Sequence, residues 1–510
     1  MLVGVEPITP VLSATMKRQP KLLLINPWIT DFAAYDFWSK PLGLLYLASV
    51  LEKAGARVVL LDCMDRHHPA LAASGLQHKI KDRRYGTGKY VREIIAKPEV
   101  FAKIPRYFAR YGLPLNIFRD ELRRLGRPDG VLVTSGMTYW YPGVQTAIRE
   151  VRSLYPDVPV LLGGIYATLM PEHAATHSGA DEVVVGEAEP RIVERVNTVA
   201  GLDLQPLKLN GVDDYPFPAW HLYSRLPYAV IMTSRGCPLR CSFCASFAIS
   251  GRFRMRNPQS VIEEFIWLAR RFNIQDIAFY DDALLTNLQR HLVPIMQGIR
   301  RAGLTLRLHT PNGLQCKLIE PELAKEMYAT GFRSIRLSLE SVDNERQKKD
   351  MSKKVTAESF VRAAQAFHAA GFSVQDIDAY VMMALPGQPL IEVLRTMAFV
   401  HVQRVGIRLA AFSPIPGTVD YQRAIVAGYL PADFDPLMTN NSALPIKPAH
   451  LDYETFNRVA LLAKTLNQYL REHGTPMDRE KPVLDRLCRS FTEHELYEAG
   501  DVPHASAPVC

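Results

Sequence analysis

Cysteine and long apolar runs are both scarce in this sequence. The 510 residues include seven cysteines, an odd number with no regular spacing, which argues against a disulfide-stabilised scaffold. No apolar run reaches the roughly 20 residues that a membrane-spanning helix needs. The first residues lack a basic segment followed by an apolar one, so we expect no secretory signal. Free thiols suit a reducing compartment, and we therefore expect a cytoplasmic protein.

Acidic residues are sparse in one part of the chain. The net charge is +8, and the stretch 79–127 holds fourteen Lys or Arg against five Asp or Glu. Tyrosines and phenylalanines are interleaved with these cations. Such a stretch can face an anionic small molecule or a lipid surface, or it can form a solvated helical lid. A basic run with aromatics can also bind nucleic acid, but we do not expect a nucleic-acid partner here.

The first part of the chain alternates short apolar runs with helical patterns. This alternation predicts a Rossmann-like, doubly wound parallel sheet over residues 21–190. The expected strands are 21–26, 57–62, 130–136, 158–164 and 181–187. Ligands of such sheets lie at the carboxyl ends of the strands. The residues at those ends that could contact a ligand are Asn26, Ser135, Gly163, Gly164 and Glu187.

A second alternating series follows a linker over residues 191–226. Its expected strands are 228–234, 276–282, 306–313, 334–341, 376–387 and 406–417. Six strand–helix units predict a partial (β/α)6 TIM-like barrel over 227–430, with its chemistry at the carboxyl ends of the strands. Residues 1–20 are expected to form an N-terminal tail, and 431–510 a mostly helical C-terminal region.

Three of the seven cysteines, Cys237, Cys241 and Cys244, lie in "GCPLRCSFCA" just after the first strand of the expected barrel. A structural zinc site would need a fourth ligand, and no other Cys or His lies close in the sequence. A four-iron cluster fits better, because three thiolates leave one iron open to bind a substrate. Cys316, near the end of the third strand, is expected to be a buried bystander thiol.

The cysteine spacing, with Phe243 before the last cysteine, resembles the signature of the radical S-adenosylmethionine (SAM) superfamily. The resemblance implies a [4Fe-4S] cluster whose open iron chelates SAM and whose electron cleaves it to a 5′-deoxyadenosyl radical. It also implies contacts to SAM or substrate from Asp281 and Asp282, and contacts to SAM from Ser338 and Glu340. Electrons would come from a reductase such as flavodoxin or ferredoxin.

The first domain resembles the cobalamin-binding domain of cobalamin-dependent radical SAM proteins through "SGMTYWYPG", "LLGGIYAT" and "VVVGEAE". This resemblance implies that Gly163 and Gly164 let the backbone approach the corrin. It implies that Ser135 and Thr138 reach the lower face or the nucleotide tail of the cofactor. Many such domains carry a cobalt-ligating histidine after the first strand. Here that loop has none, which puts lower axial ligation by the protein in doubt.

Together the resemblances imply methylation of an unactivated carbon in a small-molecule or lipid-like substrate. Two alternatives stay open. The first is a radical rearrangement or cyclisation without methyl transfer, and the second is a non-catalytic iron–sulfur or cobalamin carrier.

Overall fold

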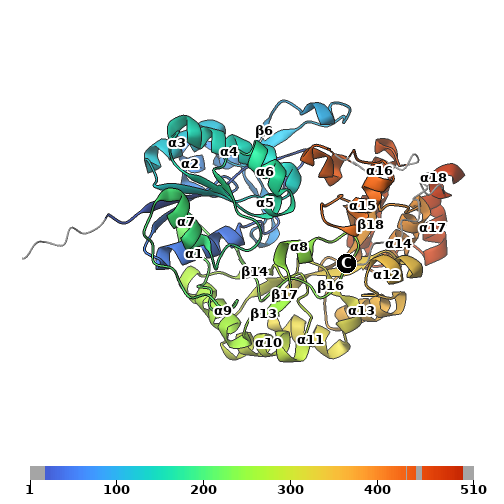
Figure 1. Ribbon diagram of the computed structural model, residues 1–510. Helices are drawn as coiled ribbons and strands as arrows, with labels where there is room; N and C mark the ends of the chain where they lie inside the picture. The colour runs from blue at the N-terminus through green and yellow to red at the C-terminus, as the bar shows by residue number, and fades with distance from the viewer. Residues whose placement is uncertain (1–17, 432, 444–450, 498–510) are drawn as a thin grey trace, which may run out of the picture.

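The computed structural model describes residues 18–431, 433–443 and 451–497. The N-terminal tail up to residue 17 and Cys510 lie outside this range. Figure 1 shows two α/β domains and a C-terminal group of helices; the first domain and these helices stand on opposite sides above the second domain. The predicted fold, a Rossmann-like domain followed by a partial barrel and a mostly helical C-terminal region, is confirmed.

The first domain is built on a five-stranded parallel sheet in the order β10-β9-β8-β1-β3. Its strands are β1 (Lys21–Asn26), β3 (Arg57–Asp62), β8 (Gly130–Val133), β9 (Val160–Leu162) and β10 (Glu182–Val183). Its helices are α1 (Leu42–Lys53), α2 (Pro69–Ala73), α3 (Leu115–Leu125), α4 (Tyr141–Leu154), α5 (Ile165–Leu169), α6 (Pro171–His177) and α7 (Ile192–Ala200). Leu22 and Leu24 pack under α1 and α7, whereas Leu23 and Ile25 pack under α3 and α4. The sheet is therefore covered on both faces, as its continuous apolar strands require.

The basic stretch combines short strands and loops with one helix at its end. It contains β4 (Lys81–Asp82), β5 (Gly88–Lys89), β6 (Arg92–Ile94) and β7 (Ala109–Tyr111), and only its last part is the helix α3. β7 pairs with β6 and with β2 (Ile29–Asp31), and the β6–β7 hairpin projects from the domain (Figure 1). Over most of the stretch, short strands and loops therefore stand where a helical lid was one expectation.

The second domain has six parallel strands in sequential order. They are β11 (Ala229–Ile231), β14 (Asp276–Phe279), β15 (Arg307–His309), β17 (Phe332–Glu340), β18 (Ile377–Met383) and β19 (Gly406–Ala411), and the short β16 (Leu314–Gln315) also pairs with β17. The helices between them are α9 (Pro258–Phe272), α10 (Leu292–Arg301), α11 (Pro321–Thr330), α13 (Ala357–Ala369) and α14 (Leu390–Val402). In the described part of the chain β11 and β19 do not pair, so the barrel is open.

Four C-terminal helices follow the barrel, and one of them, α16, packs against its edge strand β19. These are α15 (Val419–Val426), α16 (Tyr453–His473), α17 (Glu480–Cys488) and α18 (Glu493–Tyr497). Asn467 on α16 accepts a hydrogen bond from Ile407 N at 2.7 Å and donates one to Ile407 O at 2.8 Å. These two bonds occupy the backbone groups of Ile407 on the edge strand β19. None of the helices in the described ranges combines the length and apolar character that a bilayer crossing requires.

An aromatic loop of the first domain docks into the barrel. Trp38 is 1% exposed, and its indole stacks on His309 of β15 with 4.4 Å between ring centroids. In the same loop Asp36 accepts hydrogen bonds from Arg66 at 2.8 Å and from the Tyr228 hydroxyl, which precedes β11. These buried contacts fix the first domain against the barrel.

Candidate active site

The cysteine loop follows the first barrel strand. β12 (Ser234–Arg235) and β13 (Arg254–Met255) pair antiparallel and turn the chain back on itself, and α8 (Ser246–Ser250) lies between them in the sequence. Gly236 permits the turn because its φ is 77° and a Cβ there would lie 3.2 Å from Gly251 O. Cys237, Cys241 and Cys244 therefore share one loop at the carboxyl end of the barrel.

The three thiols suit a metal cluster better than a single ion. Cys237 and Cys241 are partly buried, and Cys244 is exposed. Desolvation by the surrounding protein atoms raises the pKa of all three thiols, that of Cys241 to about 11, so metal binding has to displace their protons. Among the described residues, no three His, Cys, Asp or Glu side chains converge to hold one metal ion. Three cysteines on one loop match the ligand number of a [4Fe-4S] cluster with one open iron, whereas a structural zinc site takes four ligands.

A buried ion pair lies beside the cysteine loop. Glu340 ends β17 with a left-handed φ of 62°, and its Oε1 lies 2.9 Å from Lys354 Nζ. The second carboxylate oxygen, Oε2, is buried without a hydrogen-bond partner. Burial would lower the pKa of Lys354, but Glu340 and the nearby thiols raise it, so the ammonium stays charged. Lys354 also lies 5.6 Å from the ring centroid of Phe243. A strained residue with a buried, unpartnered acceptor indicates a ligand-facing position.

The two aspartates after β14 have different surroundings. Asp281 is buried, and its carboxylate accepts hydrogen bonds from Thr233 N at 3.0 Å and Thr233 Oγ1 at 2.6 Å, as well as from the next serine hydroxyl. These bonds tie β14 to the start of the cysteine loop and leave Asp281 little capacity for a ligand. Asp282 is exposed and accepts a hydrogen bond from Ser246 on α8, directly beyond the cysteines. Of the pair, Asp282 is the one that faces the loop.

Ser338 and Phe243 lie at different depths. Ser338 is buried in β17 beneath Gly313, where a Cβ would come within 2.2 Å of the serine hydroxyl. Its carbonyl accepts a hydrogen bond from the fully buried Cys316 thiol at 3.4 Å, so that cysteine lies behind the strand. Phe243 is half-buried and packs with Met382 in an apolar cluster at the carboxyl end of β18.

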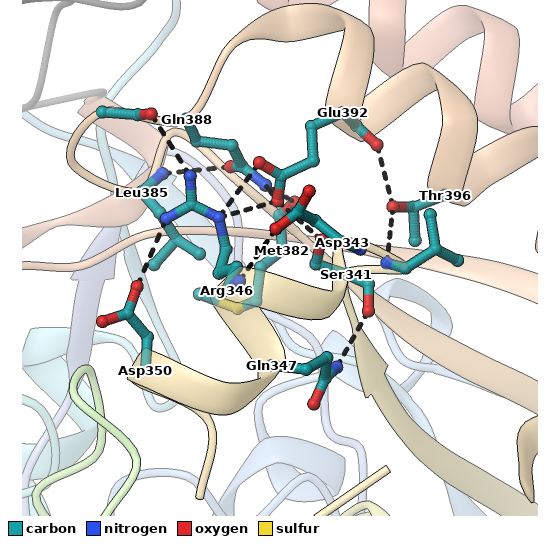
Figure 2. A network of polar contacts seen from close by, with 12 residues as sticks. Ser341, Asp343, Arg346, Gln347, Asp350, Met382, Leu385, Gln388, Glu392 and Thr396 are labelled. Atoms are coloured by element: carbon teal, nitrogen blue, oxygen red, sulfur yellow. Dashed lines mark hydrogen bonds and ion pairs between the residues drawn. The ribbon is translucent and has the colours of Figure 1, made fainter. Parts of the chain in front are cut away.

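A network of charged side chains supports the ends of β17 and β18 (Figure 2). Arg346, on α12 (Asn344–Asp350), contacts Glu392 of α14 at 2.8 Å and Asp350 at 3.5 Å. Glu392 also accepts a hydrogen bond at 2.6 Å from Ser341, the residue after Glu340. The network therefore holds the backbone on which Glu340 is strained.

The same network reaches the cysteine loop. Ser242, between the second and third cysteines, donates its N–H to Asp350 O at 2.7 Å and its hydroxyl to Asp420 at 2.6 Å. Arg423 contacts both aspartates, Asp350 at 2.8 Å and Asp420 at 2.7 Å. The cysteine loop and the end of β17 are thus held by one set of bonds.

A cavity of about 440 Å³ lies between the sheet edge of the first domain and the barrel. The first domain contributes to its wall all five residues expected at the strand ends: Asn26, Ser135, Gly163, Gly164 and Glu187. The barrel side contributes residues that flank the cysteine loop: Met232, Arg235, Ile249, Ser250 and Tyr280. None of the residues lining the cavity is a histidine.

Tight backbone packing forms one wall of the cavity. Gly164 has φ 95° and ψ −164°, and a Cβ on it would lie 2.4 Å from Ser135 O. Ser135 Oγ donates to Gly163 O at 2.7 Å, which holds the two loops together. Thr138 does not line the cavity; its hydroxyl is 2.6 Å from that of Thr439 in the C-terminal region. The expected contact between Thr138 and a cofactor stays a prediction.

Glu187 joins the two domains. Its carboxylate makes a bidentate pair with Arg254 of β13, at 2.6 and 2.9 Å, and lies 3.5 Å from Arg235. Arg235 also pairs with the buried Glu189 at 2.6 Å. Because Arg235 lies two residues before Cys237, these ion pairs connect the first domain to the start of the cysteine loop.

Sequence comparison identifies the two domains. The model of the Radical SAM superfamily matches residues 231–400, and the model of the B12 binding domain matches residues 116–196. The expected pairing of a cobalamin-binding domain with a radical SAM domain is confirmed. The expected cofactors, a [4Fe-4S] cluster, SAM and cobalamin, are those of these two domain types.

Similar proteins include several methyltransferases. Cytidylyl-2-hydroxyethylphosphonate methyltransferase of Streptomyces wedmorensis is 24% identical over 81% of this chain and 83% of its own length. Hopanoid C-3 methylase of Methylococcus capsulatus is 25% identical over 48% of this chain and 53% of its own. The solved structure of the radical SAM methyltransferase TsrM from Kitasatospora setae, with cobalamin and a [4Fe-4S] cluster bound, has a TM-score of 0.60. That match covers 93% of this chain and 100% of TsrM at 16% identity, so it shows a shared fold.

Proposed function

We propose that the chain, which carries a radical SAM domain and a B12-binding domain, methylates an unactivated carbon of a small or lipid-like molecule, as its similarity to several methyltransferases suggests. The observation that carries this proposal is the cavity between the domains. Its walls include the predicted cobalamin-facing strand ends on one side and residues flanking the cysteine loop on the other. A methyl carrier there would lie next to the site of SAM cleavage.

We assign the cluster to Cys237, Cys241 and Cys244, and SAM to the space between them and the Glu340–Lys354 pair. Lys354 offers a cation to the carboxylate of SAM, and Glu340 Oε2 offers an acceptor to its ammonium group or a ribose hydroxyl. When bound, the cluster supplies the electron that cleaves SAM, and cobalamin carries the methyl group. The residues of the chain place these partners and exclude water.

We assign cobalamin to the sheet edge formed by Asn26, Ser135, Gly163 and Gly164. The glycines let the backbone approach a large planar ligand, and the apolar strand ends beneath them suit its corrin ring. Since no histidine lines this cavity, we propose that the chain supplies no imidazole to the cobalt.

We also propose a one-electron reductase, such as a flavodoxin or ferredoxin, as partner. Each reductive cleavage of SAM consumes one electron, which has to come from a donor. A reducing compartment, the cytoplasm, would suit both this partner and the unpaired thiols.

An isotope experiment tests the function without knowledge of the substrate. The protein is reconstituted anaerobically with iron, sulfide and hydroxocobalamin, then reduced with dithionite and given SAM with a trideuterated methyl group. We expect 5′-deoxyadenosine together with trideuterated methylcobalamin, both measured by mass spectrometry. Formation of 5′-deoxyadenosine with unlabelled cobalamin would point to rearrangement or cyclisation. Absence of both products would point to a non-catalytic carrier.

A further inference from the structure

A hairpin in the basic stretch stands out from the first domain (Figure 1). It comprises β6, β7 and the residues between them, 92–111, and we call it the projecting hairpin. It holds five Lys or Arg and two Glu. Glu93 pairs with Arg110 at 2.7 Å, whereas among the described residues Lys103 and Arg106 form no ion pair. The projecting hairpin therefore carries a positive charge that its two carboxylates only partly offset.

Three apolar side chains of the projecting hairpin face solvent. Tyr107 is 75% exposed, Ile94 57% and Val100 41%. In the described ranges no other large apolar side chain is as exposed as Tyr107. Apolar side chains gathered among cations on one exposed element indicate a surface that another body covers.

An aromatic core holds the projecting hairpin in place. Phe101 and Phe108 are buried, and their ring centroids lie 5.0 and 5.4 Å from that of Phe32 in the aromatic loop. Between the two strands, Lys97 Nζ donates a hydrogen bond to Ile104 O at 2.5 Å. The exposed side chains are thus mounted on a packed support, and their exposure is a property of the fold.

The base of the projecting hairpin belongs to the same small sheet as part of the cavity wall. β7 pairs with β2 over Ile29–Asp31, and Ile29 lines the interdomain cavity. Tyr90, two residues before β6, lines the cavity as well. A surface bound by the projecting hairpin is therefore connected to the cavity through ordered structure.

We propose that the projecting hairpin binds the surface of a bilayer that contains anionic lipids. Its cations attract the anionic headgroups. Its exposed tyrosine suits the headgroup region, where amphipathic rings concentrate, and its aliphatic side chains reach the boundary of the acyl chains. The inference rests on the proposed function for one point only, since it narrows the small or lipid-like substrate to a membrane lipid.

The chemistry of the projecting hairpin favours a bilayer over other partners of a basic surface. Ile94 and Val100 gain little from a nucleic acid, which rewards cations and rings that stack on bases. A second copy of this chain would bring the same cations, and like charges oppose such a contact. A bilayer with anionic lipids is the partner that uses both the cations and the aliphatic side chains.

Two pairs of variants test the contact. The apolar variant is Val100→Ser with Tyr107→Ser. Its control is Val426→Ser with Tyr328→Ser, which removes the same two side-chain types at positions that are 55% and 41% exposed elsewhere in the fold. Binding of the full chain to vesicles of phosphatidylcholine, with and without phosphatidylglycerol, is measured by co-sedimentation.

The second pair changes charge. The charge variant is Lys103→Glu, and its control is Lys208→Glu, which reverses an exposed cation in the linker. Co-sedimentation is repeated at low and high salt, because screening weakens attraction to headgroups.

We expect the unmodified protein and both controls to bind vesicles that contain phosphatidylglycerol, and to bind pure phosphatidylcholine at least about tenfold more weakly. The apolar variant should bind the anionic vesicles about tenfold more weakly than its control. The charge variant should bind them at least about fivefold more weakly, and this difference should shrink as salt rises. Equal vesicle binding by the variants and their controls overturns the proposal.

Two further results overturn the proposal in favour of another partner. Duplex DNA that binds the unmodified protein more tightly than the charge variant, while both bind vesicles equally, points to a nucleic acid. A dimer in light scattering that only the apolar variant loses, again with equal vesicle binding, points to a second copy. If circular dichroism shows the apolar variant to be unfolded, Ile94→Ser provides the same comparison.

Failure of the proposed function would look different. Vesicle binding requires neither the cluster nor SAM cleavage, so the projecting hairpin still binds a bilayer when labelled SAM yields no labelled methylcobalamin. Normal methylcobalamin formation by a protein that does not bind anionic vesicles overturns the present inference alone.

Discussion

Replacing Gly164 with alanine tests the wall of the interdomain cavity. Its φ of 95° and ψ of −164° fall in a region that essentially only glycine occupies, at a cost of about 1–3 kcal/mol for another residue. A Cβ would also lie 2.4 Å from Ser135 O, which is backbone and cannot rotate away. Overpacking of this kind costs about 1–3 kcal/mol. We therefore expect Gly164→Ala to lower the free energy of unfolding by roughly 2–6 kcal/mol.

Gly163 provides the matched control. It also lines the cavity, but the nearest atom to an added Cβ is Val184 O at 3.8 Å, an ordinary contact distance. Gly163→Ala should change the free energy of unfolding by less than about 1 kcal/mol. Its methyl group would stand where the corrin is expected, so cobalamin binding should weaken while the fold stays intact.

Two measurements separate these effects. Urea unfolding followed by circular dichroism gives the stability of both variants, and equilibrium dialysis gives their affinity for hydroxocobalamin. If Gly164→Ala is as stable as the unmodified protein, our reasoning about its packing is wrong. If Gly163→Ala binds cobalamin normally, the corrin does not approach this backbone.

Other substitutions test the barrel. Cys237→Ala should lose the broad visible absorbance of the reconstituted protein, and an unchanged spectrum would argue against its role as a ligand. Lys354→Met leaves Glu340 buried without a cation, so we expect at least about tenfold weaker SAM binding in equilibrium dialysis. The conservative variant Lys354→Arg should retain part of the affinity. Normal affinity in Lys354→Met would contradict our placement of SAM. Burial lowers the pKa of His401 to about 4, below the ordinary 6.5, and its Nε2 accepts a hydrogen bond from Met477 N at 2.9 Å. The neutral His401 side chain therefore contributes its full stabilisation of the folded state above pH 6.5, and this contribution is lost as the pH falls towards 4. Urea unfolding should show a shallower pH dependence in His401→Gln, and identical curves would refute this role.

Much of the fold could be predicted because it depends on local pattern. The residues from Leu22 to Ile25 are all apolar, so both faces of a strand formed by them are apolar. This pattern is typical of a strand that is covered on both sides of its sheet. The docking of Trp38 onto His309 could not be predicted, since it joins residues far apart in the sequence and depends on how the two domains meet.

The candidate site could be predicted where residues that are close together in the sequence form it. The three cysteines lie within eight positions, so their spacing alone indicates a shared ligand. Lys354 was missed, because a lysine after α12 looks like any surface cation until β17 brings Glu340 to within 2.9 Å. The contact of Thr138 with Thr439 could not be predicted, because Thr439 lies 301 positions further along the chain. The expected contact of Thr138 with a cofactor stays a prediction.

Metal analysis of the reconstituted and desalted protein tests the central claim most directly. If three thiols hold the cluster while a separate sheet edge holds cobalamin, the protein should contain about four iron atoms and about one cobalt atom per chain. Replacing Cys237, Cys241 and Cys244 together by alanine should remove the iron and leave the cobalt. Zinc in place of iron, or a protein that retains no cobalt, would contradict this account.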